Sequence, residues 1–473
     1  MTRRELCKVA AGIGAEKLIR PLVWGSAGTP ALISKRPEAP KFRSAAVETF
    51  LDETRRRIVD PDLAWLFTNC FPNTLDTTVQ PGTFEGKPDT VVLTGDIAAM
   101  WLRDSSAQVW PYLPLGRRDE ALRALLEGVI RRQARCILID PYANAFMPDL
   151  DAETPLSWSL NDKTEMRRGV GERKWELDSL CYVIRLSHGY WKKIGDVRPF
   201  DAQWGQAMRL AVATMRVQQK KQGGGPYTFE RASVHPTETL PVAGAGNPIR
   251  PVGLIASGFR PSDDACTFPF LVPANLFAVT SLRQLAEMAH LILDDTKLAT
   301  EADALATEVE IALRQYAVAK TEQGTIWAYE VDGFGSQLLM DDANVPSLLA
   351  LPYLESSPDK DLYLRTRQFA WSLRNPWFFT GDAGEGIGGP HSGRAMIWPM
   401  SQMIFALTSN SDAEIRKSLA VLKASSVETG FMHESYSRDD ARKYTRAWFA
   451  WANTLFGELL AGLAASRPEL LKS

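Results

Sequence analysis

The chain carries the stretch WFAWANTLFGEL at Trp448–Leu459, and this stretch indicates the fold class. Its large apolar residues recur three or four positions apart, which places them on one face of an α-helix. The same spacing recurs along the chain, in the segments 47–58, 122–130, 204–215, 302–316 and 415–422. No regular alternation of β-branched strands with helices accompanies it, so a doubly wound sheet is not expected. The pattern predicts an all-α protein.

Long polar segments rich in glycine and proline separate the predicted helices. They run over residues 140–173, 218–265 and 375–394. Loops of this length inside a compact domain usually carry function. Many helices with long loops predict a helical toroid, in which inner and outer rings of helices surround a centre and the loops gather at one mouth. We expect only minor strands, at Thr90–Leu93 and Gly324–Tyr329, and one domain over residues 41–473, because no linker divides the chain after residue 40.

The composition excludes several classes of protein. The 473 residues are 45% hydrophobic and 23% charged, with a formal net charge of −2, as is typical of a globular enzyme. No basic run is present, so neither nucleic acid nor an anionic membrane is an expected partner, and no apolar run reaches the length of a membrane span. The five cysteines are scattered without a C-x-x-C pair, which argues against a zinc knuckle or a redox pair. The 14 tryptophans fit a carbohydrate groove, although a large core also uses tryptophan.

The first 40 residues differ from the rest of the chain. The sequence Thr2-Arg3-Arg4-Glu5-Leu6-Cys7-Lys8 precedes a short apolar stretch, Val9–Ala15, and resembles a bacterial twin-arginine export leader. Charged residues interrupt the continuation of this stretch, so a basic tail is the alternative. We therefore predict a leader and linker over residues 1–40 and an exported protein, periplasmic or extracellular, with a cytoplasmic protein as the alternative.

Polar groups are concentrated in the segment Thr94–Ser105, TGDIAAMWLRDS, which is otherwise small and apolar. An apolar setting makes each polar group costly unless it has a partner. Trp101 offers a flat apolar face, whereas Arg103 and Asp104 supply hydrogen-bond donors and acceptors. This combination suits the faces and hydroxyls of a pyranose ring. A buried ion pair beside a core tryptophan is an equally good interpretation.

Two further segments carry a carboxyl among apolar residues. In Trp175–Tyr182, the apolar neighbours of Asp178 would raise its pKa and suit a general acid, although an ordinary helix N-cap is the alternative. Glu176 is expected to face elsewhere. In Gly430–Tyr436, Glu434 precedes the last predicted helix and suits a general base, with a solvated loop residue as the alternative.

The other polar motifs are less specific. His433 has no second histidine at the spacing of a metal site, so a structural or sugar-binding role is expected. The Asp-Asp pairs in Gly258–Ala265 and Met340–Ser347 are typical of turns and caps, but they could also hold sugar hydroxyls. The segment Gly384–His391 matches the letters of a dinucleotide fingerprint without the strand and helix that it requires, so a rim loop is expected, with His391 near a ligand. Signatures of phosphate-binding loops, serine hydrolases and zinc proteases are absent from the sequence.

Together the motifs resemble glycoside hydrolase family 125, the metal-independent exo-acting α-1,6-mannosidases. The resemblance rests on blocks in one order: Phe71–Thr78, Thr94–Ser105, Gln108–Leu113, Glu176–Tyr182, Phe259–Ala265, Asp341–Tyr353, Trp398–Ser401 and Met432–Ser435. It implies an (α/α)6 barrel, in agreement with the helical toroid. It also implies inverting hydrolysis of a terminal, non-reducing α-mannose without a metal ion or cofactor. The implied partners are α-mannoside glycans and oligosaccharides.

The resemblance also assigns residues. It implies Asp178 as the general acid and Glu434 as the general base, and inversion requires their carboxyl groups to lie about 6.5–9.5 Å apart, with a water molecule between them. The sugar-binding residues that it implies are Trp101, Arg103, Asp104, Asp264, Asp342, Asn344, His391 and His433. Another enzyme of the same architecture, such as an exo-glucosidase or a polysaccharide lyase, and a non-catalytic sugar-binding protein are the alternatives.

Overall fold

The computed structural model describes residues 35–472. The predicted leader lies almost wholly outside the described residues, so export stays a prediction. Within the described part, no helix has both the length and the apolar character needed to cross a membrane. The α-helices there are α2 (Ala45–Arg55), α3 (Pro61–Cys70), α4 (Asn73–Thr77), α5 (Leu102–Val109), α6 (Glu120–Ile139), α7 (Leu177–Ile194), α8 (Ala202–Gln218), α9 (Val272–Leu291), α10 (Thr296–Tyr316), α11 (Lys360–Ala370), α12 (Pro399–Leu407), α13 (Asp412–Ser425) and α14 (Ala450–Ser466).

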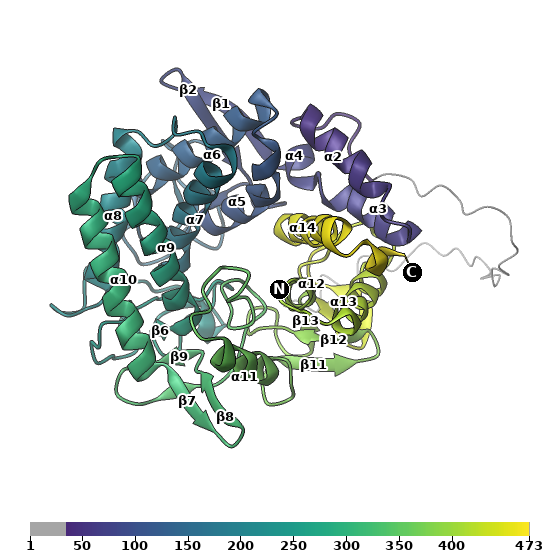
Figure 1. Cartoon of the computed structure of the whole chain (residues 1–473). Coiled ribbons are helices and arrows are strands. Elements are labelled where there is room, and N and C mark those ends of the chain that lie inside the picture. Colours follow the sequence, from purple (N-terminus) through teal and green to yellow (C-terminus); the bar gives the residue numbers. More distant parts are fainter. Residues whose placement is uncertain (1–34, 473) are drawn as a thin grey trace, which may run out of the picture. The chain divides into compact units, whose positions relative to one another are not determined.

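These helices form a ring that closes where α14 packs beside α5 (Figure 1). Every residue of α5 is buried, and α12 is buried along nearly its whole length, as expected for inner helices. The outer helix α10 instead buries one stripe, which includes Leu298, Leu305 and Val309, against α9. The predicted toroid of inner and outer helices is therefore confirmed, and the fold is an (α/α)6 barrel.

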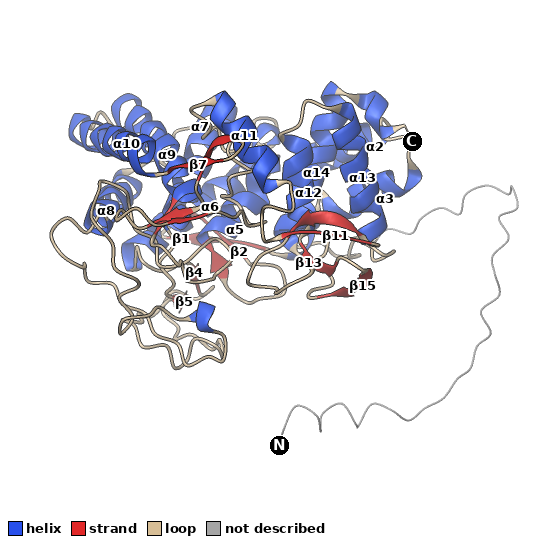
Figure 2. Ribbon diagram, turned by 90° about the horizontal axis from the view of Figure 1, so that it is seen from below, coloured by secondary structure: helices blue, strands red, loops and turns tan. Residues whose placement is uncertain are grey.

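Small antiparallel strands and long loops gather at one end of this ring, whereas the hairpin of residues 318–327 lies beside α11 (Figure 2). The strands are β1 (Val79–Phe84), β2 (Lys87–Val92), β3 (Met100–Trp101), β4 (Ala145–Phe146), β5 (Val170–Glu172), β6 (Phe270–Leu271), β7 (Val318–Thr321), β8 (Gly324–Trp327), β9 (Glu330–Val331), β10 (Gln337–Leu338), β11 (Phe378–Gly381), β12 (Gly384–Ile387), β13 (Met396–Ile397), β14 (Tyr436–Ser437) and β15 (Asp440–Tyr444). The two predicted strands correspond to β2 and β8. The sheet β3-β4-β5 brings the start of α5 next to the loop that precedes α7.

The two longest loops pack against each other at this end. Lys163 and Glu230 form an isolated β-bridge, and Thr164 Oγ1 donates to the backbone carbonyl of Thr228 at 2.8 Å. Asp162 accepts a hydrogen bond from Arg231 Nη2 at 2.6 Å. Because these contacts satisfy polar groups that irregular backbone leaves unpaired, the loops can form a fixed wall around the mouth of the barrel.

Candidate active site

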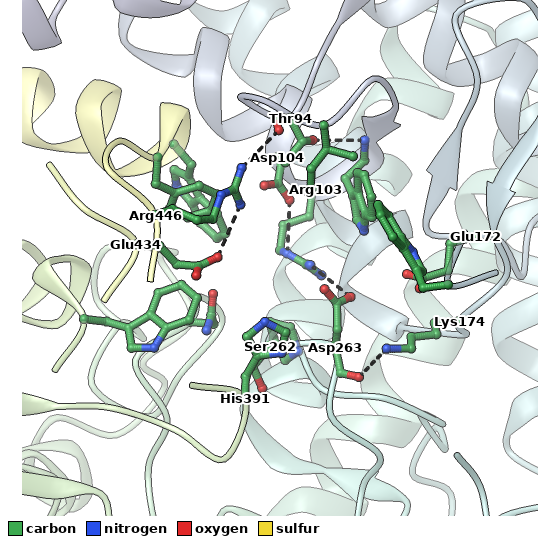
Figure 3. A pocket seen from close by; sticks show the side chains of 18 of the residues that line it. Thr94, Arg103, Asp104, Glu172, Lys174, Ser262, Asp263, His391, Glu434 and Arg446 are labelled. Atoms are coloured by element: carbon green, nitrogen blue, oxygen red, sulfur yellow. Dashed lines mark hydrogen bonds and ion pairs between the residues drawn. The ribbon is translucent and has the colours of Figure 1, made fainter. Parts of the chain in front are cut away.

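A cavity of about 410 Å³ opens where the inner helices begin (Figure 3). Trp101, Trp398 and Phe449 occupy the N-cap positions of α5, α12 and α14, and all three residues line the cavity. N-cap positions usually hold small polar residues that bind the first backbone N–H groups. Aromatic residues at these positions give flat apolar surface to the cavity wall instead. The volume lies in the range of small-molecule sites.

Trp101 joins β3 to α5 and is only 5% exposed. Its Nε1 has no hydrogen-bond partner among residues 35–472. A buried donor without a partner is costly, so this N–H suits a hydroxyl group of a bound sugar. The structure thus places the predicted sugar-binding residue Trp101 in the cavity wall.

Arg103 lines the cavity and also holds a cluster of buried carboxyl groups. Its Nη1 lies 2.7 Å from Glu176 Oε2 and 3.2 Å from Asp178 Oδ2. Its Nε lies 3.6 Å from Asp104 Oδ2, and its Nη2 lies 3.9 Å from Asp263 Oδ1. The expectation that Glu176 faces away from Asp178 is wrong, because both carboxyls contact one guanidinium group. The two interpretations of the segment that carries Arg103 are therefore compatible, since the segment forms buried ion pairs and also faces the cavity.

Glu434 faces the cavity from the segment that precedes β14, and its side chain is 11% exposed. Its Oε2 accepts a hydrogen bond from Thr445 Oγ1 at 2.7 Å, and its Oε1 accepts one from Arg446 Nη1 at 3.2 Å. Arg446 is held in turn by Asp96 and by the backbone carbonyl of Thr94. Glu434 is therefore a fixed, reachable carboxylate rather than a solvated loop residue.

Asp178 lies in the first turn of α7 and is fully buried. Glu176 occupies the N-cap position, so the alternative that Asp178 caps this helix is wrong. The described residues that line the cavity do not include Asp178, which reaches the site only through Arg103. Burial raises the pKa of Asp178 in spite of the guanidinium group. A general acid must contact the glycosidic oxygen, and the position of Asp178 does not suit that task.

Asp263 is a carboxyl of the same cluster that does reach the cavity (Figure 3). Its side chain is 26% exposed. Its φ of 65° lies in the left-handed region, which aspartate tolerates better than most residues do. Lys174 Nζ fixes the turn by donating to the backbone carbonyl of Asp263 at 2.8 Å. Sequence reasoning selected the neighbouring Asp264 and missed Asp263, because the letters of an Asp-Asp turn do not show which carboxyl points inward.

Ser262 links the predicted sugar-binding residues Asp264 and Asp342. Its Oγ lies 3.3 Å from Asp264 Oδ2 and 3.0 Å from Asp342 Oδ2. Asp342 also accepts a hydrogen bond from the backbone N–H of Asn344 at 3.0 Å. Ser262 and Asn344 line the cavity. The carboxyls of Asp264 and Asp342 are buried behind them and are not among the described residues that line the cavity. Asp264 and Asp342 therefore support the wall that Ser262 and Asn344 present to a ligand.

The two histidines that the sequence singled out lie in different surroundings. His391 lines the cavity beside Trp398, with 6.2 Å between the ring centroids. His433 is buried, its Nδ1 lies 2.8 Å from the backbone carbonyl of Ala447, and its ring stacks on Tyr444 with centroids 4.0 Å apart. It lies outside the cavity lining formed by residues 35–472. The contacts of His433 therefore fit a structural role better than sugar binding.

The two long loops and the residue that follows the first of them supply part of the cavity lining that the sequence does not predict. These residues are Trp158, Glu172, Lys174, Arg231 and Glu238. Arg231 Nη2 binds Glu172 Oε1 at 2.9 Å across the junction of the two loops. Irregular loops have no periodic pattern, so the only available signal was their unusual length.

The fold and the site together define a class of protein. A helical barrel surrounds a cavity with tryptophan faces and with two carboxyls, Asp263 and Glu434, on different sides (Figure 3). This arrangement is that of a glycoside hydrolase, which places a sugar between an acid and a base. Among residues 35–472, no group of three or more His, Cys, Asp or Glu side chains is arranged to hold a metal ion.

Comparisons with known proteins identify the family. Residues 60–461 match the family described as metal-independent alpha-mannosidase, GH125. The meiotically up-regulated gene 157 protein of Schizosaccharomyces pombe is 40% identical over 450 residues, which cover 91% of this chain and 88% of that protein. A Streptococcus pneumoniae α-mannosidase, solved as a non-productive substrate complex with α-1,6-mannobiose, is 37% identical with a TM-score of 0.85, and the match covers 90% of this chain and 100% of that one. The chain belongs to the GH125 family of metal-independent α-mannosidases.

Proposed function

We propose that this protein removes terminal α-1,6-linked mannose with inversion, using Asp263 as the general acid and Glu434 as the general base. The observation that carries the proposal is the position of these two carboxyls on different sides of one cavity (Figure 3). Membership of the family supports an α-mannoside as the substrate. The mannobiose bound to the Streptococcus pneumoniae relative supports the 1,6 linkage.

Glu434 is suited to activate water. Thr445 and Arg446 each hold one of its oxygen atoms, so the carboxylate keeps one orientation in the cavity. It takes one proton from a water molecule as the oxygen of that water attacks the anomeric carbon. Attack from the face opposite the leaving group inverts the configuration, so the first product is β-mannose.

Asp263 is suited to protonate the leaving group. It lies in the cavity across from Glu434, and it gives a proton to the glycosidic oxygen as the bond to the anomeric carbon breaks. We assign the acid to Asp263 rather than to Asp178, because Asp178 is buried behind Arg103. We expect the two catalytic carboxyls to lie about 6.5–9.5 Å apart, the separation that leaves room for water.

Asp104 is a further carboxyl of the cavity, and burial raises its pKa to about 6. It lies beside Arg446, on the side of the base (Figure 3). An inverting acid and base must flank the sugar from opposite faces. We therefore assign Asp104 to the hydroxyl groups of the bound mannose, together with Trp101 and Arg103.

Proton NMR of the reaction with α-1,6-mannobiose tests the proposal. We expect β-mannose to appear first and α-mannose to form later by mutarotation. Initial release of α-mannose would contradict the inverting mechanism, and an intact mannobiose would contradict the substrate assignment. A parallel panel of aryl α-glucosides and uronic-acid polysaccharides covers the other enzyme classes, because a lyase yields an unsaturated product that absorbs ultraviolet light.

A further inference from the structure

Glu176 is a buried carboxyl that the proposed reaction does not use directly. It occupies the N-cap position of α7, and it is 1% exposed. Its side chain makes no cap hydrogen bond within the described chain and points instead into the carboxyl cluster around Arg103. A residue at this position would normally bind the first N–H groups of its helix, so the orientation of Glu176 requires another explanation.

The contacts of Glu176 lead to Asp263. Glu176 Oε2 accepts hydrogen bonds from Arg103 Nη1 at 2.7 Å and from Ser179 Oγ at 2.9 Å. Asn144 Nδ2 lies 3.3 Å from Glu176 Oε1 and also 3.3 Å from Asp263 Oδ1, so one amide group bridges the two carboxyls. The two carboxyls also lie close enough for each to act on the pKa of the other. Two carboxyls can share a hydrogen bond only if one of them keeps a proton.

The charges around the pair are unbalanced. The charged and titratable groups that face Glu176 and Asp263, from the elements packed against them, are Arg103, Asp104, Glu172, Lys174, Asp178 and His391. Glu172 is already paired with Arg231. Two cations, Arg103 and Lys174, would then face more buried carboxylates than they can neutralise if every acid were ionised. A cluster of this kind retains at least one proton at neutral pH.

The distribution of that proton follows from burial. Burial raises the pKa of Glu176 well above its ordinary value, although Arg103 opposes this effect. Burial acts on Asp263 in the same direction, but Lys174, Arg103 and the contact with Glu176 together outweigh it, and the pKa of Asp263 lies below its ordinary value. In the resting cluster, a proton held by the pair therefore lies mainly on Glu176 and not on Asp263 at neutral pH. A general acid in that condition needs a proton from a neighbour.

We propose that Glu176 is a positioning residue that shares one proton with Asp263 and so keeps Asp263 able to act as the general acid. This inference rests on the proposed function of Asp263. The pair carries one proton before the reaction. The proton passes from Asp263 to the glycosidic oxygen, while Glu434 takes one proton from the attacking water. The pair then binds a proton from solvent, and Glu434 releases one, so each turnover consumes one water molecule and no net proton.

The pH profile of kcat/KM on α-1,6-mannobiose tests the inference, because its alkaline limb reports the essential acid. In Glu176→Gln, the shared proton is lost and the cations act on Asp263 alone. The alkaline limb should therefore shift to lower pH by about one unit or more, and kcat/KM at a pH above the limb should fall about tenfold. In Ser179→Ala, the carboxylate form of Glu176 loses a hydrogen-bond donor, which makes loss of the shared proton harder. The alkaline limb should therefore shift to higher pH. Asp178→Asn is the matched control, because Asp178 contacts the same Arg103 Nη1 but, among the described contacts, does not share the Asn144 amide with Asp263. It moves the limb by less than Glu176→Gln does.

α-Mannosyl fluoride separates this effect from misfolding, since fluoride leaves with little help from an acid. Glu176→Gln should hydrolyse the fluoride at nearly the wild-type rate. The inference is overturned if the alkaline limb stays at the wild-type pH in both Glu176→Gln and Ser179→Ala. It is also overturned if Asp178→Asn shifts the limb as far as Glu176→Gln does. The proposed function survives that result if Asp263→Asn fails to cleave mannobiose in the same assay. If Asp263→Asn cleaves mannobiose normally, the proposed function itself is overturned.

Discussion

The two sides of the cavity hold their carboxyl groups in different ways. On the acid side, Asp263 belongs to a buried cluster in which Glu176 and Asp178 share the guanidinium group of Arg103. On the base side, Glu434 accepts hydrogen bonds from Thr445 and Arg446, and Arg446 is held in turn by Asp96, whose side chain is 55% exposed. An excess of carboxyls in a dry cluster retains a proton, whereas hydrogen-bond donors to a carboxylate favour its ionised form. The difference explains how one cavity can present an acid and a base at the same pH.

The largest effect is expected on the base side. Glu434→Gln keeps the shape of the side chain but cannot accept a proton from water, so we expect kcat on α-1,6-mannobiose to fall by about 10²–10⁴-fold. Thr445→Val removes only one of the two donors to Glu434 and should cost far less. Steady-state kinetics of both variants check this order. Equal losses in the two variants would mean that the orientation of the carboxylate, and not its basicity, limits the rate.

Loss of Arg103, the cation at the centre of the acid side, should lower the free energy of unfolding more than loss of Arg446 on the base side. Arg103→Met leaves Glu176 and Asp178 buried without a cation, and breaking a buried pair costs about 3–5 kcal/mol. Arg446→Met should cost less stability, because it leaves only one buried carboxyl, Glu434, without this cation, and its other partner, Asp96, is largely exposed. Urea unfolding followed by fluorescence measures both variants.

The cost of Arg103→Met should also depend on pH. Glu176 and Asp178 have raised pKa values in the folded protein, so their protonated forms favour folding at low pH, and this contribution is lost as the pH rises through the folded-state pKa values. Without Arg103 these values rise further. The stability deficit should therefore shrink when the pH falls from 8 to 5. A deficit that is constant with pH would show that the cluster does not hold ionisable charge.

A smaller effect, on KM, is expected for Trp101 in the cavity wall. Trp101→Phe keeps an aromatic face but removes the Nε1–H, which has no partner in the described chain. If this donor binds a mannose hydroxyl, one hydrogen bond worth about 0.5–1.5 kcal/mol is lost, and KM should rise about two- to tenfold. An unchanged KM would mean that Trp101 contributes only its ring.

The smallest effect should come from the exposed end of the base side. Asp96→Asn removes the ion pair between Asp96 and Arg446, and exposed pairs contribute about 1 kcal/mol or less. We expect kcat to change by less than about fivefold, with a smaller change at high salt. A loss as large as that of Glu434→Gln would show that the base side depends on an ion network as much as the acid side does.

Much of the fold could be predicted from the sequence, because helical spacing depends on local burial. The residues around Leu298 and Val309 alternate between core and solvent, and the observed α10 follows that pattern. The sequence also singles out Glu434 and Trp101, and both line the cavity. Each is a polar or aromatic residue in an apolar stretch close to an inner helix.

The acid side could not be predicted in the same way. Asp178 has apolar neighbours in sequence, but its carboxyl is covered by Arg103, which comes from a different helix. Asp263 depends on a left-handed backbone conformation that turns it, rather than Asp264, toward the cavity. The loop residues Trp158 and Arg231 reach the cavity only because two irregular segments pack together. These features arise from tertiary contacts that no periodic pattern records.

The assignment of the acid is tested most directly by comparing Asp263→Asn and Asp178→Asn on two substrates that differ only in the leaving group. With α-1,6-mannobiose, which needs a protonated leaving group, Asp263→Asn should lose at least about 10²-fold in kcat/KM, and it should retain most activity on α-mannosyl fluoride. Asp178→Asn should affect both substrates to a similar degree, because it acts through Arg103. The opposite pattern, with Asp178→Asn selectively inactive on mannobiose and Asp263→Asn near wild type, would contradict the account.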